Sequence, residues 1–577
     1  MLIRDLHNFR HHFYELVKRE KHTTIFVNLD VDALCACYIL MHAFNCDNVS
    51  YTVNPIDSWT SLQNSLLEYC AHSSYIILIN CGAYRSFLSI DLPENVTVFV
   101  IDSQRPFHLD NVFNRDAIQL LAYSSEIESW KLPKVEDVYA SDTDESDEDE
   151  EDDDEEDPMR ERARIADRIA ERALRRQKKA QWKRNRANVL WEYYMKTWYS
   201  TPVSVMVLEL AHELNKCDAG MMWCAAVGLS SQLADKLISM ESYNKVCVDR
   251  MRPFIRKYSP RNQQAQCKGD DVMKISFESD LLLPVYTHWT LYDSMTNDVH
   301  FSCQSKLWTQ KGNSGLRHII ATLGLTLNEC RQSYSIMPID RRKEVFKILE
   351  KHLNSNFATF SSHFGYAKQF NAFDFARALS LRLECRLDAK ETFYDRFMAS
   401  RFILDKFLAG ECAHETLNNA IQNYKVGLKA ITSMVFTAVS QSHVINCSTY
   451  FLLVVHATSD SIYLTSRHCL FSFAHFIQRA FASARNARRM EKPLVVAVPL
   501  GEPDAGWFWV TGLMPLAEYI KETEWKSIFA RAFEHVAERS NIMIKRDSFD
   551  PNIIMVKSEE RTKFFNNLDA ILEASEN

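Results

Sequence analysis

The stretch TTIFVNLDVDALCACYIL, residues Thr23 to Leu40, decides the fold expected for this chain. It opens with a strand-like run and then places Asn28, Asp30 and Asp32 at alternate positions. Alternate side chains share one face of an extended chain, so both carboxylates are expected to point the same way where a buried strand ends. An apolar helical run follows at once.

Two interpretations of these carboxylates stay open at this point. A strand that ends in acids before a helix suits a hard-metal or phosphate site in an α/β sheet. The alternative is structural, because Asp at a helix N-terminus caps backbone N–H groups and complements the helix dipole.

The first 125 residues alternate between strand and helix patterns. The expected strands are Thr23–Val27, Val49–Val53, Tyr75–Asn80 and Val96–Ile101, and the expected helices between them include Ala33–Phe44 and Trp59–Cys70. This alternation predicts a parallel sheet covered by helices, which is an α/β fold.

Residues 141–157, SDTDESDEDEEDDDEED, interrupt the pattern with fourteen acidic residues. Such a segment cannot bury apolar surface and is expected to be disordered. Without those fourteen charges, the net charge changes from −8 to +6, so the rest of the chain is mildly basic.

A basic helix is expected directly afterwards, over residues 160–198. Between Arg160 and Arg186 there are twelve Lys or Arg against three acids. One interpretation is a long solvated helix beside the acidic segment, and the other is nuclear import or a protein or nucleic-acid contact. The candidate contact residues are Arg175, Arg176, Lys178, Lys179, Lys183 and Arg184.

The pattern from about 203 to 400 is mostly helical, and the last third is mixed again. Expected helices in the central part include Val203–Asn215, Cys224–Met240 and Lys343–Leu353. In the last third the expected strands are Tyr450–His456, Ser461–Thr465, Leu494–Val498 and Trp507–Leu513, with helices over Phe471–Arg488 and Lys526–Arg539. This part is predicted to form a second α/β domain.

Composition excludes several classes of protein. Glycine is scarce, with 13 residues, and no Gly-rich phosphate loop is present, which argues against an ATP-driven motor. The fifteen cysteines are scattered without a C-x-x-C pair, as expected of reduced thiols in an intracellular protein. No signal peptide or membrane span is expected, and no cofactor is predicted.

Polar groups follow three of the expected strands in the first domain. They are Asn28-x-Asp30-x-Asp32, Asn80-Cys81-Gly82 and Asp102-Ser103-Gln104-Arg105-Pro106. The carboxyl ends of parallel strands meet at one sheet edge, which is the usual ligand position. This arrangement resembles the DHH phosphoesterases, a family that includes the RecJ single-strand exonucleases.

The match to that family's metal site is partial. Asp30, Asp32 and Asp102 fit its acidic positions, whereas Asn28 and Asn80 stand where acids are expected. The resemblance also places Ser103 and Gln104 at its two histidines and Gln232 at a later acid. Because Asn and Gln carry no charge, the resemblance implies a remnant site without a catalytic residue or a metal.

A second resemblance is narrower. The segments NLDVDALCACYIL, YIILINCGA, IDSQRP, ISFESDLLLPVYTHWTLYDSM and SSHFGYAKQF are similar to the cell division cycle 45 family of RecJ-like eukaryotic replication factors. It implies a DHH-like domain over 1–240, a mainly helical insertion over 241–390 and a DHHA1-like α/β domain over 391–577.

The same resemblance implies function through assembly. The expected protein is a nuclear, non-motor subunit of the replicative helicase that binds the MCM hexamer and the GINS complex. DNA polymerase at the replication fork and weakly bound single-stranded DNA are further expected partners, whereas no membrane and no homo-oligomer are expected. The rivals are a metal-dependent exonuclease of the RecJ type and a free-standing single-strand binding protein.

Overall fold

The computed structural model describes most of the chain. The described residues are 2–20, 22–70, 73–90, 92–114, 116–139, 158–258, 273–353, 357–364, 367–388, 390–411, 414–484, 491–502, 504–516 and 525–576. The acidic segment 141–157, which the sequence predicts to be disordered, lies outside these residues.

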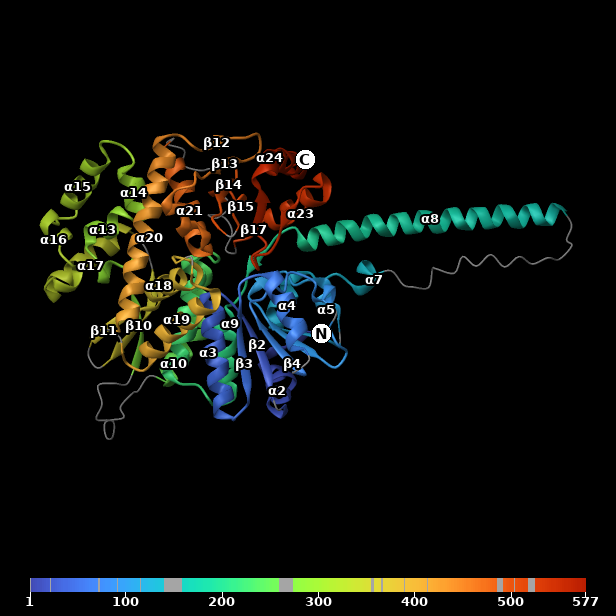
Figure 1. Ribbon diagram of the computed structural model, residues 1–577, viewed down its shortest axis with the longest axis horizontal. Helices are drawn as coiled ribbons and strands as arrows, with labels where there is room; N and C mark the ends of the chain where they lie inside the picture. Colours follow the sequence, from blue (N-terminus) through green and yellow to red (C-terminus); the bar gives the residue numbers. More distant parts are fainter. Residues whose placement is uncertain are drawn as a thin grey trace.

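The N-terminal part forms a parallel sheet, as the alternating pattern predicts (Figure 1). Each neighbouring pair of strands in this sheet runs parallel. Across the sheet the order is β1 (Leu2–Arg4), β7 (Ile118–Ala122), β5 (Thr97–Ile101), β4 (Tyr75–Ile79), β2 (Thr23–Asn28) and β3 (Tyr51–Ile56). The expected α/β fold class is confirmed.

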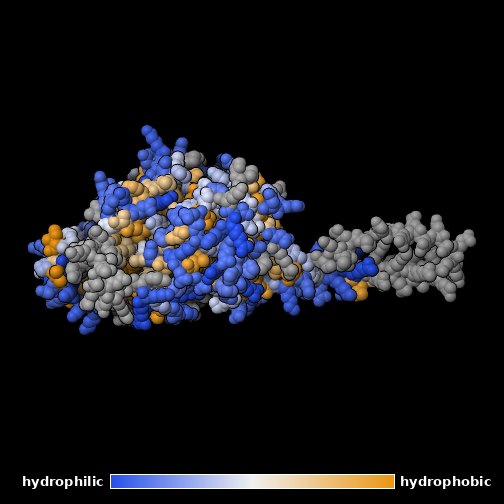
Figure 2. Space-filling model, turned by 90° about the horizontal axis from the view of Figure 1, so that it is seen from below, coloured by the Kyte–Doolittle hydropathy of each residue, from blue (hydrophilic) through white to orange (hydrophobic). Residues whose placement is uncertain are grey.

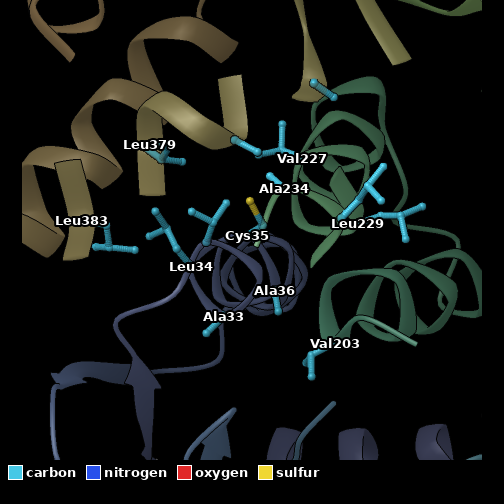
Figure 3. Packing of buried hydrophobic residues seen from close by; sticks show 14 of the residues in the cluster. Ala33, Leu34, Cys35, Ala36, Val203, Val227, Leu229, Ala234, Leu379 and Leu383 are labelled. Carbon is cyan, nitrogen blue, oxygen red and sulfur yellow. The ribbon is translucent and has the colours of Figure 1, made fainter. Parts of the chain in front are cut away.

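Helices cover both faces of this sheet because successive strand residues point to opposite sides. Ile25 and Val27 of β2 pack in a core with α3 (Val31–Cys46), α9 (Val203–Glu213) and α10 (Ala219–Ala234). Phe26 packs on the other face with α4 (Trp59–Tyr69) and α5 (Leu109–Phe113). Figure 3 shows α3 side chains, including Ala33 and Ala36, packed close to residues of neighbouring helices.

The last third contains a mixed sheet in which β13 and β14 pair in parallel and the other neighbouring strands pair antiparallel. Its order is β12 (Ile445–Asn446), β13 (Phe451–Val454), β14 (Leu494–Pro499), β15 (Trp507–Leu513), β17 (Ile553–Lys557) and β16 (Ile544–Lys545). The helices of this part are α20 (Glu415–Ser440), α21 (Arg467–Ala484), α23 (Phe529–Ser540) and α24 (Arg561–Glu576).

The middle of the chain is mostly helical, but it also holds a sheet that the sequence pattern did not reveal. Three antiparallel strands, β9 (Met273–Ser279), β10 (Ala358–Phe364) and β11 (Ala367–Asn371), lie beside the helices. The helices are α11 (Met240–Val246), α12 (Arg252–Tyr258), α13 (Leu291–Thr296), α14 (Val299–Ser305), α15 (Gly312–Thr322), α16 (Leu327–Arg331), α17 (Ile339–Leu353), α18 (Ala372–Glu384) and α19 (Phe393–Leu408). The domain boundaries at 240 and 390 stay predictions.

Sequence-based expectations about two elements of the middle and last thirds were wrong. Ser461–Thr465 is part of a 3-10 helix over Ser459–Thr465, because Thr458 and Ser461 form a capping box that starts a helical turn. The helix expected to run to Met240 ends at Ala234, because Lys236 adopts a left-handed conformation with φ of +59°.

The basic helix extends away from the body of the molecule (Figure 1). It is α8 (Pro158–Tyr194), and the expected end at residue 198 is corrected because Trp198–Tyr199 form strand β8. The C-terminal part of α8 contacts the body, through α7 (Val135–Val138) among others. The face shown in Figure 2 is mostly hydrophilic, with apolar residues scattered across it. Within the described ranges, no helix is long and apolar enough to cross a membrane.

Candidate functional site

The ends of β2, β4 and β5 bring the polar residues predicted from the sequence to one edge of the parallel sheet. They enclose a small cavity of about 20 Å³, which is room for about one water molecule. Its predicted lining residues are Asn28, Asp30, Asp32, Asn80, Asp102, Ser103, Gln104 and Gln232. Residues from distant parts of the chain complete the wall: Tyr199, Ser231, Leu237, Arg467, Phe549 and Asp550.

Asp30 caps helix α3, as the structural interpretation of the sequence predicts. Its carboxylate accepts a hydrogen bond of 2.7 Å from the backbone nitrogen of Ala33. The side-chain amides of Asn28 and Asn80 donate to the same carboxylate at 2.8 and 3.4 Å. Asp30 is only 3% exposed, so these three N–H groups replace the water that it loses on burial.

Asp32 was expected to cap the helix that follows it, but its carboxylate binds a different helix. The backbone nitrogens of Val203 and Ser204 donate to it at 2.9 and 3.0 Å, and the Ser204 hydroxyl donates at 2.6 Å. Asn80 Nδ2 adds a fourth contact at 3.1 Å. Asp32 therefore caps α9, where the N-terminal end of the helix dipole favours a negative charge.

Asp102 is held by backbone groups of two turns. The nitrogens of Gly82 and Ala83 donate to one carboxylate oxygen at 3.0 and 2.9 Å, and the nitrogen of Gln104 donates to the other at 2.8 Å. Burial raises the pKa of Asp102, and the three backbone hydrogen bonds oppose that effect. Asp30, Asp32 and Asp102 thus each have several protein donors.

Asn80 links the three strand ends. Its Oδ1 accepts hydrogen bonds from the backbone nitrogen and the hydroxyl of Ser103, at 3.0 and 3.3 Å, while its Nδ2 donates to Asp30 and Asp32. Its φ of +53° lies in the left-handed region, which Asn tolerates better than most residues. An amide is suited to this position because a carboxylate could not donate to two further carboxylates.

Two glutamine amides contribute atoms that have no partner among the described protein groups. Gln104 Nε2 and both amide atoms of Gln232 are in this state, although the two residues are only 3% and 2% exposed. Both line the cavity. Buried amides are normally hydrogen-bonded, and the cavity has the volume of about one water molecule beside these atoms.

Arg467 reaches the cavity from α21, far along the chain. It donates to Asp235 at 3.0 Å, and Asp235 also contacts His468 Nδ1 at 2.7 Å. Burial is the largest influence on Asp30 and raises its pKa to about 7, while the positive charge of Arg467 acts to lower it. Arg467 is thus a cation that the C-terminal part of the chain supplies to carboxylates of the N-terminal sheet. No sequence pattern marked it.

The candidate contact residues on α8 lie elsewhere. Side chains of Arg175, Arg176, Lys178, Lys179, Lys183 and Arg184 are exposed along that helix. Near the body, Trp182 Nε1 donates to the backbone oxygen of Glu136, and Arg186 Nε donates to that of Val138. The structure therefore does not bring these basic side chains to the carboxylate cavity.

The donor set of the cavity limits its chemistry. Within the described part of the chain, no group of three or more His, Cys, Asp or Glu side chains is placed to hold a metal ion. The positions beside the carboxylates carry neutral amides and a hydroxyl, from Asn28, Asn80, Ser103, Gln104 and Gln232.

Comparison with known proteins assigns the family. The family model described as CDC45 matches residues 23–168 and 133–571, ranges that contain every residue lining the cavity. The chain belongs to the CDC45 family. The resemblance drawn from the sequence motifs is therefore confirmed.

Individual CDC45 relatives match along almost the whole chain. The Cell division control protein 45 homolog of Homo sapiens is 32% identical over 590 residues, which cover 98% of this chain and 99% of the relative. The crystal structure of CDC45 from Entamoeba histolytica covers 99% of this chain and 100% of its own, with a TM-score of 0.67 and 19% identity, and shows that the fold is shared. The RecJ of Thermus thermophilus in complex with Mn²⁺ gives a TM-score of 0.45 at 12% identity, covering 99% of this chain and 55% of RecJ.

Proposed function

We propose that this CDC45-family chain is a non-catalytic subunit of the eukaryotic replicative DNA helicase. It acts in the nucleus by binding the MCM hexamer and the GINS complex, and it activates unwinding during initiation and elongation of DNA replication. Membership of a family whose relatives are named for control of cell division supports this proposal.

The observation that carries the non-catalytic part is the occupation of the remnant carboxylates by protein donors. Asp30, Asp32 and Asp102 each accept three or more hydrogen bonds from N–H or O–H groups of the chain. A two-metal phosphoesterase needs ions about 4 Å apart, each with open carboxylate oxygens. A cavity of about 20 Å³ that Arg467 also lines does not fit such a pair.

The residues beside the carboxylates also argue against catalysis. Ser103 and Gln104 stand where the phosphoesterase resemblance places imidazoles, and neither side chain can act as a proton carrier near neutral pH. Asn28 and Asn80 provide no charge to balance a divalent ion, and both amides already donate to Asp30. Hydrolysis of a phosphodiester is therefore not assigned to this chain.

We propose that binding of this chain shifts the population of conformational states of the MCM ring. A subunit without an ATP site can only stabilise the state of the ring that it binds more tightly. The exposed basic side chains of α8 are candidates for a contact with a partner protein or with weakly bound single-stranded DNA, which the subunit would guard at the fork. DNA polymerase at the fork is a further proposed partner, and the chain acts without forming a homo-oligomer.

An affinity pull-down from nuclear extract, with and without ATP, tests the proposed assembly. We expect mass spectrometry to recover MCM and GINS subunits with the full chain. A matched variant with Ser103→Ala loses only the 3.3 Å hydroxyl contact to Asn80, keeps the backbone hydrogen bond of residue 103 and should recover them equally, because the remnant site is not proposed as an interface. Recovery of neither complex would remove the support for the proposal.

A nuclease assay on single-stranded DNA with Mg²⁺ or Mn²⁺ tests the rival. We expect no metal-dependent degradation, and Ser103→His with Gln104→His should not create it because positions 28 and 80 still lack charge. Robust degradation that Asp30→Ala and Asp102→Ala both abolish would instead establish a RecJ-type exonuclease.

A further inference from the structure

A second and much larger cavity lies between the N-terminal parallel sheet and the C-terminal mixed sheet, which are stacked one above the other in Figure 1. Its volume is about 800 Å³, enough for several amino-acid residues in an extended chain. We call it the interdomain cleft. Asn28 and Asp57 line it from the first sheet, and Leu500 and Trp509 line it from the second.

The charge of the interdomain cleft disfavours a polyanion. Seven acidic side chains line it against three arginines. Burial raises the pKa of three of the seven, Asp30, Asp57 and Glu384, so the negative charge comes mainly from Glu502, Asp504, Asp547 and Asp550. One of the arginines, Arg467, is already bonded to Asp235, which does not line the cleft. Two of the seven, the exposed Glu502 and the partly exposed Asp504, mark the mouth of the cleft, where Lys545 lies 4.0 Å from Asp504. A phosphodiester backbone would meet net repulsion here, whereas a cation would be attracted.

The apolar part of the lining suits long cationic side chains. Ile462, Leu500 and Met555 can cover the aliphatic stems of Lys or Arg, which keep their charged ends near the carboxylates. The half-buried indole of Trp509 lines the same space, and an indole face attracts a cation at close range. Carboxylates combined with an aromatic wall are the chemistry that recognises ammonium and guanidinium groups.

Two buried polar atoms of the lining residues add a second, independent indication. Glu384 Oε1 is shielded from solvent and has no hydrogen-bond partner among the described groups. Arg396 is 8% exposed, and its Nε is likewise without a partner there. A ligand that offers both N–H donors and oxygen acceptors would pair with both after small side-chain adjustments, and a peptide carries both kinds of group.

We propose that the interdomain cleft binds an extended, Lys- or Arg-bearing segment of a partner protein and rejects nucleic acid. The basic side chains lie against Trp509 and the carboxylates at the mouth, and the backbone of the segment supplies acceptors toward Arg396. Binding would hold the two sheets together, because residues from both line the cleft.

Photo-crosslinking of the full chain tests the proposal, with an oligolysine peptide that carries a benzophenone as the probe. We expect cross-links at Leu500, Trp509 or their neighbours, reduced at least tenfold in a variant with Glu502→Lys and Asp504→Lys. Both substituted side chains lie near the mouth and make few contacts, so this variant should fold. The control, with Glu94→Lys and Glu559→Lys, changes the net charge equally and should keep the cross-links.

A separate arm, run without the peptide because oligolysine itself binds DNA, uses oligothymidine that carries a photoreactive base. This probe should not cross-link at the cleft of the natural chain, and Trp509→Ala should weaken the peptide cross-links. Cross-links confined to the acidic segment 141–157, or cleft cross-links that the charge-reversed variant retains, would overturn the proposal. Cross-links of the photoreactive oligothymidine at Leu500 or Trp509 would overturn it in favour of a nucleic-acid site.

Discussion

Asp32 accepts two hydrogen bonds from Ser204, 3.0 Å from the backbone nitrogen and 2.6 Å from the hydroxyl. Through this pair the first turn of α3 is joined to the first turn of α9 inside the core. We expect Asp32→Ala to lower the free energy of unfolding by about 3 kcal/mol, because it leaves buried donors of α9 without an acceptor. Ser204→Ala should cost about 1 kcal/mol.

A double-mutant cycle in denaturant measures the coupling between the two residues. The combined loss should be smaller than the sum of the single losses, since each single change already removes their shared hydrogen bond. Asp116→Ala, at an exposed carboxylate, is the control and should change little. Strict additivity of the two losses would contradict the assigned contact.

Gly228 permits α10 to approach this pair. A Cβ at this position would lie 2.1 Å from Ser204 Oγ and 2.9 Å from Asp32 Oδ1. We therefore expect Gly228→Ala to lower stability by about 1 to 3 kcal/mol through overpacking. Thermal unfolding checks this against Gly501→Ala, whose Cβ would meet nothing within 4 Å. Equal melting temperatures for the two variants would show that the helices can separate without cost.

The ionisation of Asp30 should make stability depend on pH. Its pKa is raised from 3.8 to about 7, so the folded state binds the proton more tightly than the unfolded state. This contribution to stability is complete below pH 4 and is lost as the pH rises toward 7. Asp30→Asn keeps a cap for α3 but removes the titration. As the pH rises from 5 to 8, the free energy of unfolding of Asp30→Asn relative to that of the natural chain should therefore increase, by up to about 2 kcal/mol.

Unfolding at several pH values gives this difference directly. The pH range is the decisive part, because a carboxylate whose pKa is lowered would change stability only below about pH 4 and not between pH 5 and 8. A stability difference between Asp30→Asn and the natural chain that does not change from pH 5 to pH 8 would show that Asp30 stays ionised throughout.

The acidic segment is predicted to contribute charge and little packing. Deletion of residues 141–157 should leave the melting temperature nearly unchanged, because a segment without apolar residues has no core to lose. It should also strengthen salt-dependent, non-specific DNA binding by removing fourteen negative charges next to α8. Circular dichroism and binding at two salt concentrations check both parts, and a cooperative loss of structure would contradict the first.

The parallel sheet and its polar strand ends could be predicted because local patterns determine them. The run before Asn28 is β-branched and apolar, and the carboxyl ends of parallel strands must meet. The three-stranded sheet with β9 and β10 was not predicted, because its strands lie in a helical context. Strands β10 and β11 pair as a hairpin, but β9 and β10 are more than 70 residues apart, and nothing within β9 indicates which distant strand it pairs with.

The site was predictable only in part, because contacts between distant parts of the chain complete it. Asp30 and Asp32 are both followed by a helix, so the pattern suggested that both cap that helix. Whether Asp32 instead caps α9 depends on where Val203 is placed in space, although the sequence Thr201-Pro202-Val203-Ser204 does read as a helix start. The role of Arg467 could not be predicted, because a single arginine at a helix start forms no motif. Its position beside the cavity depends on how the two sheets pack together.

Unwinding of a forked DNA by purified MCM with GINS, in the presence and absence of this chain, decides whether the chain acts through assembly. We expect a strong rise in ATP-dependent unwinding only when the chain and GINS are both added, an equal rise with Ser103→Ala, and intact single-stranded products. Unwinding that is indifferent to the chain, or products degraded in a manner that requires Asp30 and Asp102, would contradict it.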